Sequence, residues 1–360
     1  MNPKVAIILI NYKDYANRFL TECRDSLRAQ TYPADSFAVY IVDNATSDKS
    51  RQYLAECYPE AKVIPRPDGN YSAGNNTGIN AARQDGMTLF AIANMDTRFE
   101  PDWLAELVKG VLSAPDIGIA QSKLLLYPQN DDERKDPLIN SLGNVQHYLG
   151  FGYTSGYRQK VSACVNIGEI SSISGYASGC ALIVKDELLK KIGDYNEDFY
   201  MYHDDVELSW RAKLAGYKIV LAPRSAVFHK YEFNRSVRMY YYMERNRYMV
   251  LFNFYRWRTI LLLLPILFIM ELGVAGFSVL RGGFITKLRV YGYYLKPGSW
   301  WRIFRARRAV ARFRQVTDKQ VLSTMSGRLD FSEVNNWVLE NLGNPICELY
   351  FYLIKKIIVW

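Results

Sequence analysis

Acidic and imidazole side chains occur at four places where residues of these types could do chemistry. Asp43 and Asp96 each follow a short apolar run, the pair Asp204-Asp205 opens a helix-like segment, and His229 follows a further β-branched run. Carboxylates and an imidazole can bind a divalent cation together, and a carboxylate can also accept a proton as a general base. Each feature alone is weak, because an aspartate after a strand is more often a turn or helix cap. Their order along the chain favours one shared site.

The elements between these residues predict an α/β fold that brings them to one sheet edge. Short apolar runs alternate with helical patterns, which predicts a mixed, mostly parallel sheet with helices on both faces. The expected strands are Val5–Asn11, Ala38–Asp43, Lys62–Pro65, Leu89–Asn94, Ala181–Val184 and Lys218–Ala222. The expected helices are Arg18–Gln30, Ser47–Cys57, Gly74–Arg83, one that begins at Pro101, Asp186–Ile192 and Asp204–Ala215. Open α/β sheets bind ligands beyond the carboxyl ends of strands, where Asp43 and Asp96 are expected.

Composition and charge limit the class of partner. The 360 residues suffice for one large domain and an appendage, and the net charge of +9 favours an anionic partner such as nucleotide phosphates, acidic lipid or nucleic acid.

The five cysteines are scattered and never spaced as CxxC, so neither a disulfide framework nor a zinc site is indicated and a reducing cytosol fits. No signal peptide precedes the first strand, so the N-terminus is expected to stay where it is made. Since no Walker or Rossmann glycine pattern occurs, a dehydrogenase is disfavoured.

Several motifs, taken in order, resemble the family-2 glycosyltransferases of the GT-A fold, and within them the rhamnosyltransferase-like group. The resemblance covers about residues 4 to 250. Its main segments are Val42-Asp43-Asn44-Ala45-Thr46-Ser47-Asp48, Gly74-Asn75-Asn76-Thr77-Gly78-Ile79, Asn94-Met95-Asp96-Thr97, Ser178-Gly179-Cys180-Ala181, Phe199–Leu208, Ala215-Gly216-Tyr217, Pro223 and His229. So many segments in order are more specific than any one of them. The resemblance implies a GT-A catalytic domain over residues 1–236 and a C-terminal helical, membrane-associating region over residues 237–360.

The same resemblance implies a metal-dependent, inverting transfer of a sugar from a nucleotide diphosphate. Asp96 and His229 would hold a divalent cation, Mn²⁺ or Mg²⁺, which stabilises the departing diphosphate as a Lewis acid. Asp205, the second residue of the Asp204-Asp205 pair, would be the general base for the acceptor hydroxyl. The alternative is that both aspartates only cap the following helix. Arg211 either belongs to the same motif or is a structural partner of an acidic neighbour.

The remaining site residues are expected around the nucleotide sugar. Asp43 is a pure acceptor, so it favours the imide N–H of uracil or thymine over cytosine or adenine. Asn76 and the small residues beside it would let the backbone approach the nucleotide. Arg235 and Arg245 could close over the diphosphate, although a solvated basic face explains them almost as well. The full set expected at the nucleotide sugar is Asn11, Asp43, Asn44, Asn76, Asn94, Met95, Asp96, Gly179, Arg235 and Arg245.

The C-terminal third changes character and predicts contact with lipid. Ile260–Leu280 is an apolar run of transmembrane-like length, interrupted by a proline and by Glu271. A single crossing would put the arginine segment 302–314 outside, against the positive-inside tendency. Trp300 and Trp301 beside these arginines indicate an interfacial helix attracted to anionic lipid. Peripheral or monotopic attachment to the cytoplasmic face of the plasma membrane is therefore favoured over a span. The alternative is a helix buried in an oligomer interface, so a homo-oligomer stays open.

Together, these inferences predict a glycosyltransferase that acts in cell-surface polysaccharide synthesis. The subgroup resemblance favours rhamnose from dTDP-rhamnose as the donor, with a hydroxyl of a glycan or lipid-linked glycan as the acceptor. One alternative is a polyprenyl-phosphate glycosyltransferase that uses a UDP-sugar, and the other is a non-catalytic sugar-binding or scaffold protein of the same fold. Nucleic acid is not expected as a partner, because the arginines adjoin an apolar run rather than a base-reading module.

Overall fold

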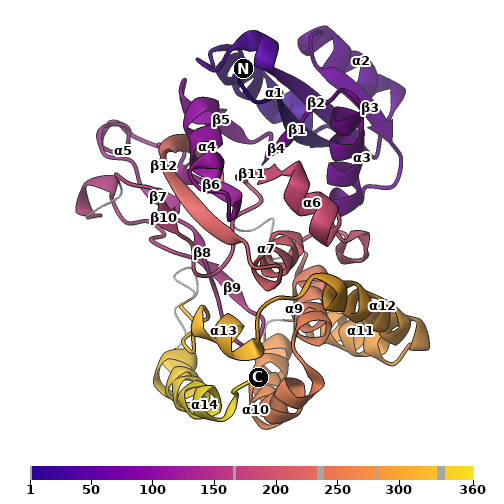
Figure 1. Cartoon of the computed structure of the whole chain (residues 1–360), viewed down its shortest axis with the longest axis vertical. Helices are drawn as coiled ribbons and strands as arrows, with labels where there is room; N and C mark the ends of the chain where they lie inside the picture. Colours follow the sequence, from indigo (N-terminus) through magenta and orange to yellow (C-terminus); the bar gives the residue numbers. More distant parts are fainter. Residues whose placement is uncertain (1, 165–167, 233–238, 281, 331–336) are drawn as a thin grey trace. The chain divides into compact units, whose positions relative to one another are not determined.

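A computed structural model describes the whole chain except residues 1, 165–167, 233–238, 281 and 331–336. The chain forms two compact units, coloured along the sequence in Figure 1. The sheet unit comprises residues 2–144, 154–212 and 217–231, and the helical unit comprises residues 145–153, 213–216 and 232–360, apart from the gaps just given. The helical unit thus takes two short segments from within the first two thirds of the sequence.

The sheet unit is built on a ten-stranded mixed sheet. Its strands are β1 (Val5–Tyr12), β2 (Phe37–Asn44), β3 (Lys62–Arg66), β4 (Leu89–Ala93), β5 (Thr97–Phe99), β6 (Ile117–Leu126), β7 (Ile139–Ser141), β10 (Ser171–Ser172), β11 (Ala181–Lys185) and β12 (Lys218–His229). The order is β10-β12-β6-β11-β4-β1-β2-β3, with β5 on β12 and β7 on β6. β1 to β4 are parallel, and the antiparallel β11 lies between β4 and β6. The predicted mixed, mostly parallel sheet with helices is therefore confirmed. A separate two-stranded sheet joins β8 (Asn144–Gln146) and β9 (Gly152–Thr154).

Helices cover both faces of this sheet. They are α1 (Tyr15–Arg28), α2 (Asp48–Cys57), α3 (Tyr71–Gln84), α4 (Trp103–Leu112), α5 (Asp131–Lys135), α6 (Asp186–Ile192) and α7 (Asp204–Leu214). Val5, Ile7 and Leu9 of β1 belong to the core that contains residues of α1, α2 and α4, while Ile8 and Ile10 face α3. Because β1 is covered on both faces, its sequence is a continuous apolar run rather than an alternating one.

Glycine allows α3 to approach β1 closely. A Cβ atom on Gly78 would lie 2.6 Å from the Ile8 side chain, and one on Gly74 would lie 3.3 Å from Ile10. The small residues of this motif therefore serve the packing of the helix on the sheet, a close approach that only glycine permits. Their expected approach to a nucleotide stays a prediction.

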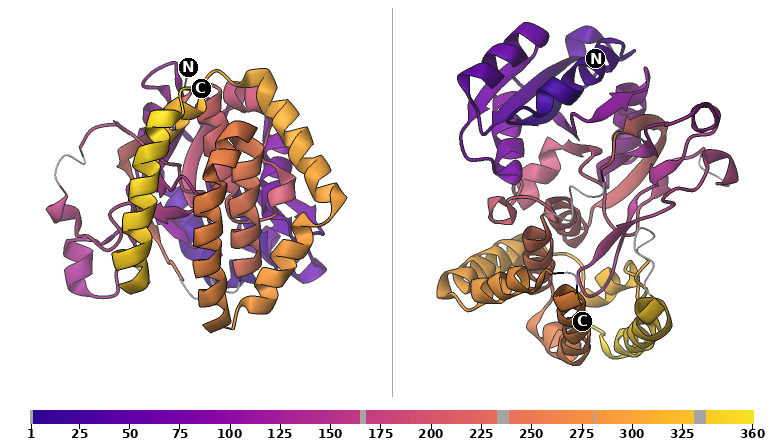
Figure 2. Two further views of the ribbon diagram at one scale, coloured as in Figure 1. Left: turned by 90° about the horizontal axis from the view of Figure 1, so that it is seen from below. Right: turned by 180° about the vertical axis from the view of Figure 1, so that it is seen from behind.

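The helical unit contains mainly long helices. They are α9 (Tyr240–Phe254), α10 (Trp257–Leu280), α11 (Phe284–Tyr294), α12 (Pro297–Phe313), α13 (Asp318–Ser323) and α14 (Asn344–Ile357), with a π-helical turn at Leu339–Gly343 before α14. Figure 2 (left) shows several of these helices side by side in one layer. Among the described residues, α10 is the one helix long and apolar enough to cross a membrane, judged by length and composition.

Candidate active site

Asp96 and His229 are brought together by the register of one antiparallel strand pair. β12 continues beyond Ala222, where the sequence-based strand ended, passes an irregularity and ends at His229. There His229 pairs with Thr97 of β5, the residue after Asp96, and the Lys230 backbone N–H donates to the Asp96 carbonyl at 2.9 Å. The two predicted metal ligands therefore lie beside each other, although they come from distant parts of the sequence.

The facing atoms of this pair are His229 Nε2 and Asp96 Oδ1, which lie 3.5 Å apart. Both side chains are buried, and the distance is longer than a normal N–H···O hydrogen bond. Burial opposes a charge on the ring, but the nearby Cys180 and Asp96 outweigh it and raise the pKa of His229 to about 10. The negative field that favours a proton at this place would also favour a divalent cation.

Asn140 orients the His229 ring from its other side. The Asn140 Oδ1 atom lies 2.9 Å from His229 Nδ1. With a pKa near 10 the metal-free ring carries a proton on both nitrogens. A bound cation would displace the proton on Nε2, while Nδ1–H could still donate to Asn140, as in histidines that bind metals. Asn140 lies in β7, which was not among the strands expected from the sequence, and no motif pointed to it. Over the described parts of the chain, no cluster of three or more His, Cys, Asp or Glu residues could hold a metal ion, so this site offers a two-residue ligand set.

A strained turn precedes the Asp204-Asp205 pair. Tyr200, Tyr202 and His203 have φ angles of 67°, 61° and 59°. Non-glycine residues adopt such angles at a cost of about 1–3 kcal/mol each, and they do so mostly where contacts hold the turn for a functional reason. The turn fixes where α7 begins and therefore where the two carboxylates lie.

Asp205 is the more exposed of the two carboxylates and accepts two backbone hydrogen bonds. Its Oδ2 accepts from the Gly179 N–H at 3.2 Å, and its Oδ1 accepts from the Val206 N–H at 2.8 Å. Burial raises the pKa of Asp205 to about 6, against these two hydrogen bonds, which lower it. Burial and the charge of Asp205 raise the pKa of the buried Asp204 well above its ordinary value. Asp205 is thus the member of the pair that is ionised at neutral pH and can accept a proton.

The start of β11 connects Asp205 to the strand end that carries Asp96. The Asn94 N–H donates to the Cys180 carbonyl at 2.9 Å, just after β4. Gly179, which binds Asp205, directly precedes Cys180, and Asp96 lies two residues after Asn94. The predicted base and the predicted metal ligand therefore lie at the same edge of the sheet.

Asp43 is the last residue but one of β2 and is completely buried. Its Oδ1 accepts from Asn11 Nδ2 at 2.7 Å, and its Oδ2 accepts from the hydroxyls of Thr46 at 2.5 Å and Ser50 at 2.7 Å. A carboxylate offers about four acceptor positions, so one on Oδ1 remains for an imide N–H. Asn11 and Ser50, which bind this carboxylate, line a pocket of about 250 Å³ together with residues of the turns after β1 and β2 and of the helices that follow them.

The side chain of Asn76 contacts the segment around Tyr195. Its Nδ2 donates to the Tyr195 carbonyl at 2.9 Å and to Glu197 Oε1 at 3.0 Å, and its Oδ1 accepts from the Tyr195 N–H at 2.8 Å. Both amide protons are therefore used to anchor the segment that leads into the strained turn. The side chain therefore supports the segment that leads to the acidic pair, while the approach of the backbone to a nucleotide at this position stays a prediction.

Four other residues were expected to bind the nucleotide sugar. Met95 is buried in the hydrophobic core, Asn44 is buried at the end of β2, and Arg235 falls outside the described residues. Arg245 belongs to the helical unit, where it is buried and lies over the rings of tyrosines 241, 242 and 293. Such a packed guanidinium is not the solvated basic face that was one alternative for it. The role of these residues in donor binding stays a prediction.

Arg211 is held by structural contacts. Its guanidinium donates to Glu207 Oε2 at 2.6 Å and to the carbonyls of Ile192, Gly193 and Asp194. It therefore ties α7 to the turn after α6, as the structural alternative expected. Tyr71 was not singled out from the sequence, yet its hydroxyl donates to Asn94 Oδ1 at 3.3 Å.

This mixed sheet with acidic residues at its strand ends is the GT-A fold of nucleotide-sugar glycosyltransferases. A crystal structure of GalNAc-T7 with UDP, GalNAc and Mn²⁺ has a similar fold, with a TM-score of 0.50 and 14% sequence identity over 64% of this chain and 44% of that one. Residues 6–165 match the family model "Glycosyl transferase family 2". The predicted resemblance to the family-2 glycosyltransferases is thereby confirmed over this part of the chain.

Two relatives connect this family to cell-surface polysaccharides. The chain is 28% identical over 242 residues to the O-antigen biosynthesis protein RfbC of Myxococcus xanthus, covering 63% of this chain and 17% of that protein. It is 24% identical over 209 residues to the N-acetylglucosaminyl-diphospho-decaprenol L-rhamnosyltransferase of Mycobacterium tuberculosis, covering 53% of this chain and 66% of that protein. The matches therefore span a small part of the first relative and slightly under two thirds of the second.

Proposed function

We propose that this chain is a metal-dependent, inverting glycosyltransferase whose favoured donor is dTDP-rhamnose. The observation that carries the proposal is the buried pair Asp96 and His229, whose facing atoms lie 3.5 Å apart at a strand end. A carboxylate and an imidazole suit Mn²⁺ somewhat better than Mg²⁺, and the donor diphosphate would complete the coordination. When bound, the cation would neutralise the leaving diphosphate as a Lewis acid.

Asp205 would act as the base on the acceptor. Each of its oxygens accepts one backbone N–H and keeps a further lone pair for the proton of an acceptor hydroxyl. As that oxygen attacks the anomeric carbon opposite the diphosphate, the configuration inverts. The pocket beside Asp43 would take the thymine or uracil base, whose imide N–H would bind the remaining acceptor position on Oδ1.

A hydroxyl of a lipid-linked glycan is the favoured acceptor. The name of the Mycobacterium tuberculosis relative describes transfer of L-rhamnose to a sugar on a decaprenyl diphosphate. The apolar helix α10 gives a second, weaker reason to place this chain at a membrane, here the cytoplasmic face of the plasma membrane. Anchoring the enzyme there would hold its site close to an acceptor that cannot leave the bilayer.

The proposal is tested by offering the full chain several dTDP- and UDP-sugars with Mn²⁺ and a polyprenyl-diphosphate-linked sugar. We expect transfer from dTDP-rhamnose, loss of transfer with a chelator, and recovery with added Mn²⁺. Transfer to a polyprenyl phosphate instead would support a polyprenyl-phosphate glycosyltransferase. Nucleotide binding without turnover of any donor would support a non-catalytic protein and contradict our proposal.

A further inference from the structure

The helical unit exposes an apolar face along α10. This helix has a mean hydropathy of 2.4 in its most apolar window, yet only 22% of that window is buried. Leu261, Leu264, Phe268, Leu272 and Val279 are all exposed, with Leu261 at 65% and Phe268 at 66%. Their spacing of three, four, four and seven residues puts them on one side of the helix. A continuous apolar stripe of this kind marks an interaction surface rather than a water-facing one.

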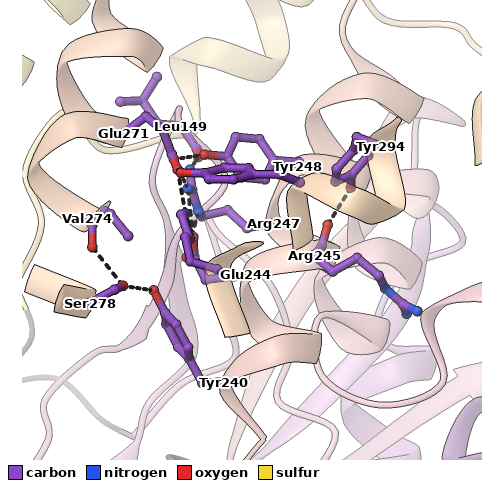
Figure 3. Close-up of polar contacts among 12 residues, drawn as sticks. Leu149, Tyr240, Glu244, Arg245, Arg247, Tyr248, Glu271, Val274, Ser278 and Tyr294 are labelled. Atoms are coloured by element: carbon purple, nitrogen blue, oxygen red, sulfur yellow. Dashed lines mark hydrogen bonds and ion pairs between the residues drawn. The ribbon is translucent and has the colours of Figure 1, made fainter. Parts of the chain in front are cut away.

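A cluster of mostly buried charges contacts α10 beside this stripe (Figure 3). Glu271 lies near the middle of α10, 3.4 Å from Arg247 of α9 and 2.8 Å from Lys287 of α11. Glu244 of α9 also forms ion pairs with Arg247, at 3.0 Å, and with Lys287. The hydroxyl of Tyr248 donates to Glu271 as well. We call Glu244, Arg247, Glu271 and Lys287 the charge clamp.

The charge clamp has two acidic and two basic residues, so its members neutralise one another. Arg247 and Lys287 are almost completely buried, and a buried charge is very unfavourable once its partner is removed. To cross a bilayer as a lone helix, α10 would have to carry Glu271 away from both basic partners. The clamp therefore opposes the separation of α10 from α9 and α11.

The chain after α10 returns to the point where α10 begins. α11 has 11 residues and a length of about 16 Å, far less than the ~30 Å of a bilayer core. Farther on, Arg307 donates to the Tyr255 carbonyl at 2.7 Å, and Asp318 accepts from the Arg256 N–H at 2.9 Å. Since Arg256 directly precedes α10, the helix and its return through α11 and α12 form a hairpin with both ends at one place.

The return arm presents basic and aromatic groups. Trp301, Arg305, Arg308 and Arg312 of α12 are exposed and share one side of that helix. Arginine and tryptophan are the side chains expected at the headgroup level of an anionic membrane. Charge complementarity therefore favours an anionic lipid surface over a neutral partner for this unit.

We propose that the exposed stripe of α10 inserts into one leaflet of an anionic membrane and that the charge clamp keeps α10 from crossing the bilayer. This deepens the membrane attachment proposed above. It does not depend on the donor, the metal or the transfer reaction, so its tests use binding and topology alone.

Vesicle flotation tests the apolar stripe. The full chain is expected to float with vesicles of phosphatidylcholine and phosphatidylglycerol, and far less with phosphatidylcholine alone. The substitution Phe268→Glu should reduce flotation at least about tenfold, because a charge cannot enter the acyl region. Leu112→Glu, at an exposed leucine of the sheet unit, is the matched control and should float like the parent. Equal flotation of the parent and Phe268→Glu overturns the proposal. A stable dimer that does not bind vesicles overturns it as well.

Protease protection tests the charge clamp. A cleavage site for a specific protease is inserted after the exposed Gly282, between α10 and α11, and the same protease is trapped inside the vesicles. We expect no cleavage of the otherwise unchanged chain, whereas the double variant Glu271→Leu/Lys287→Met, which removes one charge of each sign, should be cut from inside. Cleavage of the unchanged sequence would mean that α10 spans, and protection of the double variant would mean that the clamp does not decide the topology.

Discussion

His229 Nε2 and Asp96 Oδ1 face each other across 3.5 Å at the end of a buried strand pair. Substitution of either side chain by alanine should lower the affinity for Mn²⁺ in the presence of a nucleoside diphosphate by at least about 100-fold, because each removes one of two protein ligands. Titration calorimetry with Mn²⁺ and dTDP measures this directly. Asp102→Ala, at an exposed aspartate before α4, is the control and should bind normally. Unchanged Mn²⁺ affinity in either alanine variant would rule out that residue as a ligand.

Asn140 is expected to act on the metal only through His229. Replacing it with leucine removes the partner of Nδ1, so the ring can turn or change tautomer, and Mn²⁺ affinity should fall about 10–100-fold. Asn140→Asp keeps an acceptor at the same place and should restore most of the affinity. Both variants are compared by Mn²⁺ titration, with Asn80→Ala on exposed α3 surface as a control. Equal affinities for the leucine and aspartate variants would contradict a positioning role.

Asp205→Asn should abolish transfer and leave nucleotide affinity within a few-fold. An amide has nearly the same shape but cannot accept the proton of the acceptor, and a general base contributes about 10²–10⁴ in rate. In the unchanged protein the rate should rise with pH and level off above about pH 6, because only the ionised form of Asp205 acts as a base. Initial rates from pH 5 to 8 measure this profile. A variant that turns over normally would exclude Asp205 as the base.

The same substitution should make the stability of the fold less dependent on pH. Burial raises the pKa of Asp205 in the folded state to about 6, so its contribution to stability is present below its unfolded pKa and is lost as the pH rises through 6. The amide introduced by Asp205→Asn carries no charge at any of these pH values, and it loses one of the two backbone hydrogen bonds at every pH because only its oxygen accepts. The melting temperature of the variant relative to that of the parent should therefore rise by about 2–4 °C between pH 4 and pH 8. Thermal melts at both pH values measure this. The same difference at both pH values would show that the ionised carboxylate is well solvated.

The sequence by itself determined the alternation of strands and helices and the positions of β1 to β4, β11 and the first part of β12, whereas β5 to β10 were not predicted. β1 could be recognised because a strand covered on both faces must be apolar throughout, and α6 was predicted with its observed bounds, Asp186–Ile192. The helix expected at Pro101 begins at Trp103 instead. The order of the motifs also determined the family, because motif residues are constrained by chemistry at fixed places in a shared fold.

Only the tertiary structure decided which side chains meet. The contact between Asp96 and His229 depends on the register of β12 on β5, which is set by pairing between segments far apart in sequence. Asn140 enters the site from β7 for the same reason, and the Asn76 side chain bonds to the backbone of Tyr195, a contact that its own motif does not reveal. A sequence pattern shows which contacts a residue could make with its neighbours in the chain. Long-range register and packing decide which side chain it contacts in the folded protein.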